Sequence, residues 1–580
     1  MNRTPLLSAL FATALSGCAS TPQPAPADLI VHHAKVITVD APFSIAEAFA
    51  VKGGRIVALG DDEQIFRWKG PGTEVLDAEG HTILPGLYDS HVHLLGASTS
   101  ELEAPLPDLR SLKDAFDYIQ ARAKTTPEGQ WIVLRYAFPT RLKDARFPTR
   151  AELDAAAPRH PVLYHAGPAG MVNSKALELS GITRATESPT GGMIVKDPVT
   201  GEPTGMIRNA YGALKGVPAP IPSAGPAQRD AIKKLLAAYN ELGITSVADR
   251  NTDPDSLEHF LALEKAGELT CRITIAPSFN PQGSPEEIVK RLEALPGPAG
   301  RGGPSGTGTD WVRVGPIKLF LDGGMLNGSA YMREPWPPGP TYQIVEKDYQ
   351  GLLFIPPKQL ERVVEEAARR GWQVTAHTAG EGAMDVLLDA YSAVDRKIPI
   401  RDLRFCITHA NFPSERNLGI CRKLGVCADV QPAWLWKDGT TLWNVLGEQR
   451  MRWFQPYKTW LKYTTIGGGS DHMIKMDSLR ATNPWDPWLA MWVTLTRKTE
   501  GGIVPFPAEC LSREEAIRLY TINNAYLNRE EKLKGSLEVG KLADFIVVDR
   551  DVLTCPVDAI RDVRVLAAAV DGRFLRLRER

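Results

Sequence analysis

The stretch LPGLYDSHVHL, residues 84–94, decides the fold of this chain. Its apolar run is typical of a buried β-strand, and the run ends in a His-x-His pair, His91 and His93. Because side chains alternate between the two faces of a strand, both imidazoles lie on one face and can bind one metal ion. Asp89 shares this face and is placed to support the histidines from one layer below. Alone, a His-x-His pair is weak evidence for a metal site.

Four more polar residues follow short apolar runs farther along the chain. They are Lys318 in PIKLFLDGG (316–324), His377 in VTAHTAG (374–380), His409 in CITHANF (406–412) and Asp471 in GGGSDHM (467–473). Each histidine alone is more often an ordinary hydrogen-bonded side chain, but an unpaired lysine within a buried strand is costly. In a parallel β-barrel, active sites are built at the C-terminal ends of the strands. The order His-x-His, Lys, His, His, Asp therefore predicts a metal site at such a rim.

The chain resembles the amidohydrolase superfamily, and within it the YtcJ-like metal-dependent hydrolases that include N-substituted formamide deformylases. The resemblance covers nearly the whole chain after its N-terminal segment. It is carried by ILPGLYDSHVHL (83–94), MVNSKALELSGI (171–182), PTGMI (203–207), IKLFLDGGM (317–325), YTINNAYLN (520–528) and GSLEVGKLADFIVVD (535–549). It implies an α/β fold: a (β/α)8 TIM-like barrel with a small β-sandwich formed by the N- and C-terminal segments.

Two positions depart from the family pattern. Family members often carry a histidine before the Val-Asn-Ser run, where this chain has Pro168, and His165 is the nearby substitute. His472 follows Asp471 in place of an apolar or aromatic residue, and we expect it to add a polar group at the mouth of the pocket.

Strand and turn patterns divide the chain into segments. We predict a signal peptide over 1–17, a tether over 18–27, sandwich strands over 28–82 and 535–580, and a barrel over 83–534. Barrel strands are expected at 83–94, 244–250, 271–279 and 314–322, and then at the runs containing His377, His409, VCADVQPAW (426–434) and Asp471. Residues from about 100 to 215 remain as an inserted subdomain between strands one and two, placed to shape the pocket.

The ligand set indicates the chemistry. Imidazoles and carboxylates bind Zn²⁺ well, and an open coordination position lets the metal acidify a water to a pKa of about 7. The family resemblance implies that Lys318 is carboxylated to a carbamate bridging two divalent ions, expected to be Zn²⁺. We predict His91, His93 and Asp471 on one metal and His377 and His409 on the other. Asp471 is also the expected catalytic base. The predicted reaction is cleavage of a non-peptide, amide-type C–N bond by metal-activated hydroxide.

Two other functions fit parts of this pattern. A mononuclear aminohydrolase (deaminase) acting on a ring C–N bond typically carries a glutamate three residues after the fifth-strand histidine. This chain has Gly380 there, and Glu381 comes one residue late. A lipoprotein that binds a small molecule without turnover would keep the fold as a scaffold. Loss of metal ligands would favour that function, and all six are present.

The substrate is indicated only by apolar side chains. Trp434 and Trp436 directly follow the seventh strand, and Met325 follows Lys318, so we expect all three to bind the substrate. They favour an apolar or aromatic acyl or N-substituent over a sugar or a highly charged group. Other tryptophans of this region are expected to pack in the core.

The first residues, MNRTPLLSALFATALSGCAS (1–20), contain one arginine, a short apolar stretch and then Leu-Ser-Gly-Cys. This segment resembles a bacterial lipoprotein signal peptide, which implies lipidation of Cys18 and a membrane anchor. Ala19 after it suggests the outer membrane, so we expect a lipid-anchored protein of the bacterial cell envelope, periplasmic or exported. The alternative is an ordinary secretory signal with an incidental cysteine.

Composition limits the remaining partners. The 580 residues are 43% hydrophobic and can bury a large core. With a net charge of -1 and no basic stripe, nucleic acid is not an expected partner. The expected partner is a small-molecule substrate, and a homo-oligomer is left open. Cys421 and Cys427 could form a disulfide in an oxidising compartment, although their spacing alone does not indicate one.

Overall fold

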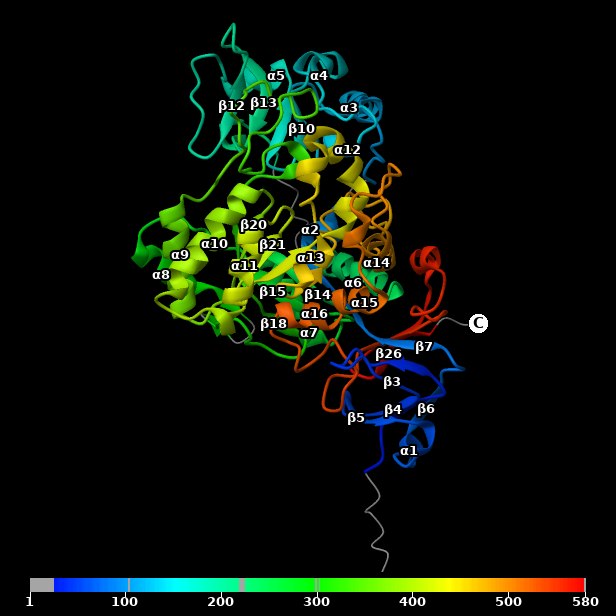
Figure 1. Ribbon diagram of the computed structural model, residues 1–580. Helices are drawn as coiled ribbons and strands as arrows, with labels where there is room; N and C mark the ends of the chain where they lie inside the picture. Colours follow the sequence, from blue (N-terminus) through cyan, green and yellow to red (C-terminus); the bar gives the residue numbers. More distant parts are fainter. Residues whose placement is uncertain (1–24, 103–104, 219–224, 298–299, 302, 578–580) are drawn as a thin grey trace, which may run out of the picture.

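The computed structural model describes residues 25–102, 105–218, 225–297, 300–301 and 303–577. Cys18, the predicted lipidation site, lies outside these ranges, as does most of the tether. Figure 1 shows three parts along the molecule: a β-rich terminal unit holding both ends of the described chain, a central α/β part, and an inserted part at the opposite end. The α/β class predicted from the sequence is confirmed.

Two parallel sheets form the central part. One has the order β18-β15-β14-β8 and contains β8 (Leu87–Val92), β14 (Ile244–Thr252), β15 (Arg272–Pro277) and β18 (Val312–Val314). The other runs in sequence order through β19 (Ile317–Phe320), β20 (Val374–Thr378), β21 (Cys406–His409), β22 (Cys427–Val430) and β23 (Ile466–Gly468). Most residues of these strands are buried whichever face they occupy, as expected for parallel strands covered on both sides.

The two sheets meet at both edges. Val92, the last residue of β8, forms an isolated parallel bridge with His472, which follows β23. Ser278, just after β15, forms another with Lys318 in β19. Only residues 315–316 separate β18 from β19, so these are two parts of the strand predicted over 314–322.

Helices cover the outside of these sheets. They are α6 (Pro226–Glu241), α7 (Pro254–Ala266), α8 (Pro285–Ala294), α9 (Pro357–Arg369), α10 (Glu381–Asp395), α11 (Glu415–Leu424), α12 (Pro432–Met451) and α14 (Pro487–Thr496). Local sequence sets their ends. For example, Asp253 caps the N-terminus of α7 by accepting the Ser256 N–H, and Pro254 occupies the first turn. Gly267 ends the helix at φ 69°, a left-handed conformation that glycine adopts without strain.

The inserted part lies between α2 (Leu94–Thr99) and α6 and includes the range predicted as an inserted subdomain. Its sheet has the order β12-β13-β11-β10-β9, with β9 (Ile132–Leu134), β10 (Val162–Ala166), β11 (Ala169–Val172), β12 (Met193–Lys196) and β13 (Pro203–Arg208). Helices α3 (Leu112–Thr125), α4 (Arg150–Ala156) and α5 (Ser174–Ser180) complete it. Figure 1 shows α12 of the central part reaching up beside this segment.

The terminal unit contains two sheets built from both ends of the chain. The first comprises β1 (Leu29–His32), β4 (Ala48–Lys52), β5 (Arg55–Gly60) and β6 (Glu74–Asp77). The second comprises β2 (Lys35–Ile37), β3 (Ile45–Ala46), β7 (Thr82–Pro85), β24 (Phe545–Val548), β25 (Val565–Val570) and β26 (Arg573–Leu577). Side chains of both sheets, such as Phe49 and Phe545 with ring centroids 5.1 Å apart, share one apolar core.

The boundary predicted at Ile83 is wrong by a few residues. Ile83 belongs to β7 and pairs with Val547 in the terminal unit, and the central sheet begins only at Leu87. Gly86 separates the two strands at a point of close approach, because a Cβ there would lie 2.0 Å from the Thr245 hydroxyl oxygen. An apolar run cannot by itself show which of two consecutive strands it belongs to.

Two further features concern the described residues as a group. None of the described helices is long and apolar enough to cross a bilayer. The six cysteines within the described ranges are unpaired, Cys421 and Cys427 among them.

Candidate active site

All six predicted metal ligands line one cavity of about 630 Å³. His91 is the next-to-last residue of β8, Lys318 lies in β19, and His377 and His409 lie near the ends of β20 and β21. Asp471 follows β23, and His93 lies two residues beyond His91. The residues come together because parallel strands deliver their C-terminal ends to the same edge.

His91, His93 and Asp471 form the tightest group. The Nε2 atoms of both histidines lie 3.2 Å from the same carboxylate oxygen, Oδ1 of Asp471. One potential ligand atom from each residue lies within 4.8 Å of the others. A hydrogen bond of 2.7 Å from the Asp471 N–H to the His91 carbonyl holds the two segments together. Three ligand atoms thus face one point, as a metal ion requires.

His377 and His409 extend this group across the cavity. Their ring centroids are 4.5 Å apart, and the His409 ring stacks on His91 at 5.1 Å. The imidazoles therefore form a continuous series from His93 through His91 and His409 to His377.

Asp429 in β22 and Gln431, which directly follows this strand, orient two of these imidazoles. Asp429 Oδ2 lies 3.1 Å from His91 Nδ1, and an ionised carboxylate only accepts, so this nitrogen carries the proton. Gln431 donates its Nε2–H to Asp429 at 3.0 Å, which turns its oxygen toward His409 Nδ1 at 2.7 Å. His409 Nδ1 is therefore also the protonated nitrogen. Both histidines keep the Nε2 lone pair available for a metal.

His377 has the opposite orientation. Its Nε2 lies 3.1 Å from the Gly323 carbonyl oxygen, which can only accept a hydrogen bond. The proton is therefore on Nε2, and Nδ1 is the atom that offers a lone pair.

Burial keeps these imidazoles neutral. It lowers the pKa of His377 to about 3, with a further contribution from the charge of Lys318. The pKa values of His91 and His409 lie well below the usual range for the same first reason, burial, together with neighbouring cationic groups. Neutral imidazoles with converging lone pairs beside a carboxylate are a donor set that fits a divalent metal ion.

Lys318 is buried in the wall of this cavity and is 1% exposed. Burial, and next the charge of Arg250, lower the pKa of its ammonium to about 8. Arg250 itself is fully buried, with its Nε–H donating to the Ser90 carbonyl at 2.8 Å. Neither terminal nitrogen of Arg250 has a hydrogen-bond partner among the described residues.

Two of the residues predicted to bind metal, His409 and Asp471, have unusual backbone angles. His409 has φ 78° and Asp471 has φ 56°, a region that non-glycine residues rarely adopt. Such conformations persist only where surrounding structure imposes them, and they cluster at functional sites.

The sequence pattern that describes the amidohydrolase family matches this chain over residues 74–576. The chain belongs to the amidohydrolase family. N-substituted formamide deformylase of Arthrobacter pascens is 29% identical over 571 residues, covering 94% of this chain and 97% of that protein. The amidohydrolase YtcJ of Bacillus subtilis is 26% identical over 551 residues, covering 91% and 96%.

The fold is shared with solved amidohydrolase structures. A metal-dependent hydrolase from Pyrococcus horikoshii, itself uncharacterised, superposes with a TM-score of 0.64 at 24% identity, covering 91% of this chain and 99% of that one. Atrazine chlorohydrolase from Arthrobacter aurescens, solved with zinc, gives 0.50 at 16% identity, with 95% of each chain covered. This amidohydrolase is therefore a hydrolase that acts on C–N bonds.

Two of the three residues predicted to bind substrate line the cavity of this amidohydrolase. Met325 is fully buried there, and Trp434 stacks on His409 with ring centroids 4.5 Å apart. Trp436 does not line this cavity and packs against Trp492, with ring centroids 5.5 Å apart. Both tryptophans are in helix α12 rather than in an extended segment. Residues two apart on a helix are about 200° apart around its axis, so they face opposite sides.

Three other residues named in the sequence analysis, His472, His165 and Glu381, contact neighbouring protein groups and do not line this cavity. His472 is buried, with Nδ1 2.7 Å from the Tyr239 hydroxyl and Nε2 2.8 Å from the Lys475 carbonyl, and it is not part of the cavity lining. His165 stacks on Tyr211 at 5.0 Å and is also outside that lining. Glu381 pairs with Arg450 at 3.3 Å and lines a different, smaller cavity. It does not take the place of the deaminase glutamate.

The supporting residues of the site differ from those expected. Asp89 acts through the backbone: its Oδ1 accepts the N–H groups of His91 at 2.9 Å and Ser470 at 3.0 Å. The imidazole partners Asp429 and Gln431 were missed. Both are polar and buried, and they stand two residues apart at the end of β22, as residues that share a face do. The alternation of polar and apolar residues in VCADVQPAW was the sequence signal that could have indicated their role.

Asp429→Asn is expected to weaken metal binding by roughly 10–100-fold, because an asparagine cannot fix the His91 tautomer as a carboxylate does. Zinc affinity, measured by chelator competition, tests this. Asp117→Asn, at an exposed carboxylate on α3, is the matched control and should leave the affinity unchanged. Equal affinities for the wild-type protein and Asp429→Asn would contradict the orienting role.

Proposed function

We propose that this protein hydrolyses the carbonyl–nitrogen bond of small N-formyl or N-acyl amines that carry an apolar or aromatic substituent. The observation that carries the proposal is the shape of one cavity: its floor holds the histidine and aspartate cluster, and its walls are aromatic and apolar. The walls include Tyr136, Phe138, Phe320, Met325, Phe354 and Trp434. A volume of about 630 Å³ lies within the range typical of small-molecule sites.

Asp471 is the residue best placed to move protons. Its Oδ1 faces His91 and His93, while Oδ2 accepts a hydrogen bond from Asn483 at 3.1 Å, which fixes the carboxylate. We infer that Asp471 accepts a proton from the attacking water and returns it to the leaving nitrogen. A divalent ion bound at the histidines supplies the Lewis acidity that activates water at neutral pH.

The aromatic wall is expected to hold the substituent and exclude bulk water from the reacting bond. Trp434 supports this role in a second way. Its indole N–H is buried and has no acceptor among the described residues. A carbonyl or hydroxyl of the substrate would satisfy it.

Two ions with Lys318 between them remain our proposal for the metal centre. Support comes from the division of ligands into two neighbouring groups and from the buried position of Lys318. The proposal includes zinc as the ion and carboxylation of the lysine. A metal-to-protein ratio near two, with a 44 Da increment on a Lys318 peptide or in intact-site mass analysis, is the supporting result. A ratio of one with unmodified Lys318 would exclude it.

The same proposal includes the closed barrel. The edge bridges between β8 and the segment after β23, and between β15 and β19, support an eight-stranded ring in which β18 and β19 count as one strand.

A panel of N-formyl and N-acyl amines tests the proposed reaction. We expect turnover of benzyl- or alkyl-substituted members, released amine as the product, and loss of activity on chelation. Ring aminohydrolase substrates such as aminopurines form the comparison set. Ammonia release from those, with no hydrolysis of any amide, would overturn the proposal.

We further propose that the protein is anchored to the cell envelope through lipid on Cys18. Cys18→Ser should move the protein from the membrane to the soluble fraction, because attached acyl chains provide the anchoring. Its hydrolytic activity should be retained, since residue 18 precedes β1. Wild-type protein in the soluble periplasmic fraction, cleaved elsewhere, would contradict the anchor.

A further inference from the structure

A second cavity of about 410 Å³ adjoins the one that holds the metal-ligand cluster. Tyr136 and Phe138, which follow β9 in the inserted part, line both cavities, so the two spaces meet at these side chains. The loop after Asp471 also serves both, because Met473 lines the first cavity while Ile474 and Lys475 line the second. The two spaces are therefore neighbours along a single wall.

The second cavity is strongly cationic. Seven of its lining residues are lysine or arginine, and two are aspartate or glutamate. The first cavity has the opposite balance, with Lys318 against five aspartates. The two cavities therefore differ in charge: the first is lined mainly by acidic groups and the second mainly by basic groups, and they meet at the aromatic side chains of Tyr136 and Phe138.

Part of the positive charge is already neutralised. Lys475 and Arg110 both pair with Asp108, at 2.6 Å and 3.6 Å. Lys437 pairs with Glu500 at 2.8 Å, and Arg141 pairs with the buried Asp438 at 2.9 Å. These pairs shape the walls and leave their cations little free charge for a ligand.

Three cations remain without an ion-pair partner within the described ranges: Arg135, Lys143 and Arg480. One terminal nitrogen of Arg135 donates to the Pro218 carbonyl at 3.0 Å, and its guanidinium is partly buried. Burial lowers the pKa of Arg135, as expected for a cation that lacks a compensating carboxylate. Lys143 and Arg480 are both exposed, and they line the cavity from segments far apart in sequence.

We propose that this second cavity binds an anionic group on the substrate, a carboxylate in the simplest case. The preferred substrate is then an N-formyl or N-acyl amine whose apolar substituent ends in a carboxylate. This inference rests on the proposed function and narrows its substrate class. The apolar part contacts the aromatic wall, and the terminal anion meets Arg135, Lys143 and Arg480.

The chain limits how long such a substrate can be. Lys475, in the second cavity, is four residues from Asp471, so their Cα atoms are at most about 14 Å apart. Part of the second cavity is therefore within about that distance of Asp471, which a substituent of intermediate length can span.

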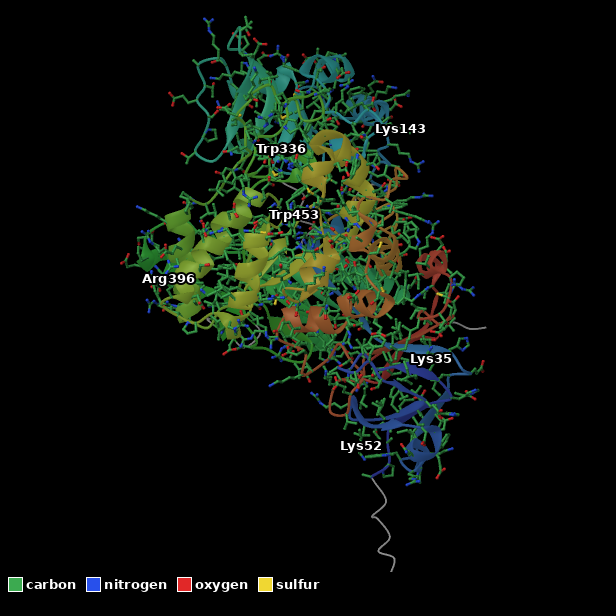
Figure 2. All side chains as sticks on the ribbon, in the orientation of Figure 1. Lys35, Lys52, Lys143, Trp336, Arg396 and Trp453 are labelled. Atoms are coloured by element: carbon green, nitrogen blue, oxygen red, sulfur yellow. The ribbon has the colours of Figure 1, made fainter. Side chains whose placement is uncertain are left out.

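The kinetic test compares N-formyl-6-aminohexanoate with N-formylhexylamine, which end in a carboxylate and a methyl group. We expect the wild-type protein to prefer the carboxylate by at least about tenfold in kcat/KM, the effect of one or two charge-assisted hydrogen bonds. The triple variant Arg135→Gln, Lys143→Gln, Arg480→Gln should lose this preference. Arg396→Gln is the control: this exposed arginine lies on the opposite side of the molecule from Lys143 in the view of Figure 2.

A binding measurement separates this inference from the proposed reaction. Calorimetry with 6-phenylhexanoate and 6-phenylhexan-1-ol requires no turnover. Tighter binding of the carboxylate that is lost in the triple variant and kept in Arg396→Gln supports the anion site, even if no amide is hydrolysed. Equal affinity for the two probes would overturn it. So would a carboxylate preference that the triple variant retains, because the anion would then bind elsewhere, for instance at the metal.

Discussion

Asp471→Asn is expected to lower kcat/KM by about 10²- to 10⁴-fold while the protein stays folded, the range typical of losing a general acid–base. Asparagine keeps the size of the side chain but can neither take the proton from water nor offer the same anionic oxygen to His91 and His93. Both imidazoles lie 3.2 Å from Oδ1 of the carboxylate whose negative charge the substitution removes. The backbone should tolerate the change, since Asp471 has φ 56° and asparagine adopts this left-handed region readily.

The matched control is Asp571→Asn. Asp571 also has a positive φ, 60°, but lies at the turn between β25 and β26 in the terminal unit. It should retain near-normal kcat/KM. Steady-state kinetics, metal content and circular dichroism of the three proteins form the measurement. If Asp471→Asn turned over substrate at close to the wild-type rate with a full metal complement, the proton transfer would have to be assigned to another group.

The convergence of the six predicted ligands on one cavity could be predicted because each stands near the end of a short apolar run. Parallel strands bring such ends together whatever the distance along the sequence. His91 and His409 are 318 residues apart, yet their rings lie 5.1 Å from each other. The position of each residue relative to its strand was enough, and no knowledge of the loops was needed.

What could not be foreseen depends on tertiary contacts. Asp429 and Gln431 orient imidazoles from β8 and β21, and only the packed structure shows which polar residue faces which ring. The position of Trp436 could not be predicted because α12 begins at Pro432, and on a helix Trp434 and Trp436 face opposite sides. The cationic cavity combines Arg135 and Lys143 with Arg480, which is more than 300 residues away, so no local pattern marks it.

The central part and the terminal unit are joined by a buried ion pair. Arg272 opens β15, and both of its bonds to Asp544, which precedes β24, are short: Nε to Oδ2 at 2.6 Å and Nη2 to Oδ1 at 2.8 Å. The two residues are 1% and 5% exposed. Asp544 also accepts the Asp571 N–H at 2.9 Å, which fixes the turn between β25 and β26. One carboxylate therefore connects a central strand with two elements of the terminal unit.

Asp544→Ala is expected to reduce the free energy of unfolding by about 3–5 kcal/mol, because Arg272 is left buried with an uncompensated charge. Asp571, 3.3 Å from Arg272 and more exposed, replaces the lost partner only in part. Urea denaturation followed by tryptophan fluorescence measures the change. Asp117→Ala removes an exposed pair on α3 and serves as the control, with an expected change within about 0.5 kcal/mol.

The double variant Asp544→Ala, Arg272→Met separates the pair from the side chains themselves. It should recover part of the loss, since no charge then remains buried. The pair should also act in a defined pH range. Burial alone would raise the pKa of Asp544, but the Arg272 charge and the hydrogen bonds from Arg272 and the Asp571 N–H together outweigh it, so the net shift is downward. Its contribution is then full above the unfolded pKa of about 3.9 and disappears as the pH falls through the lower folded value. If Asp544→Ala lost no more stability than Asp117→Ala at neutral pH, the ion pair would not be what joins the two parts.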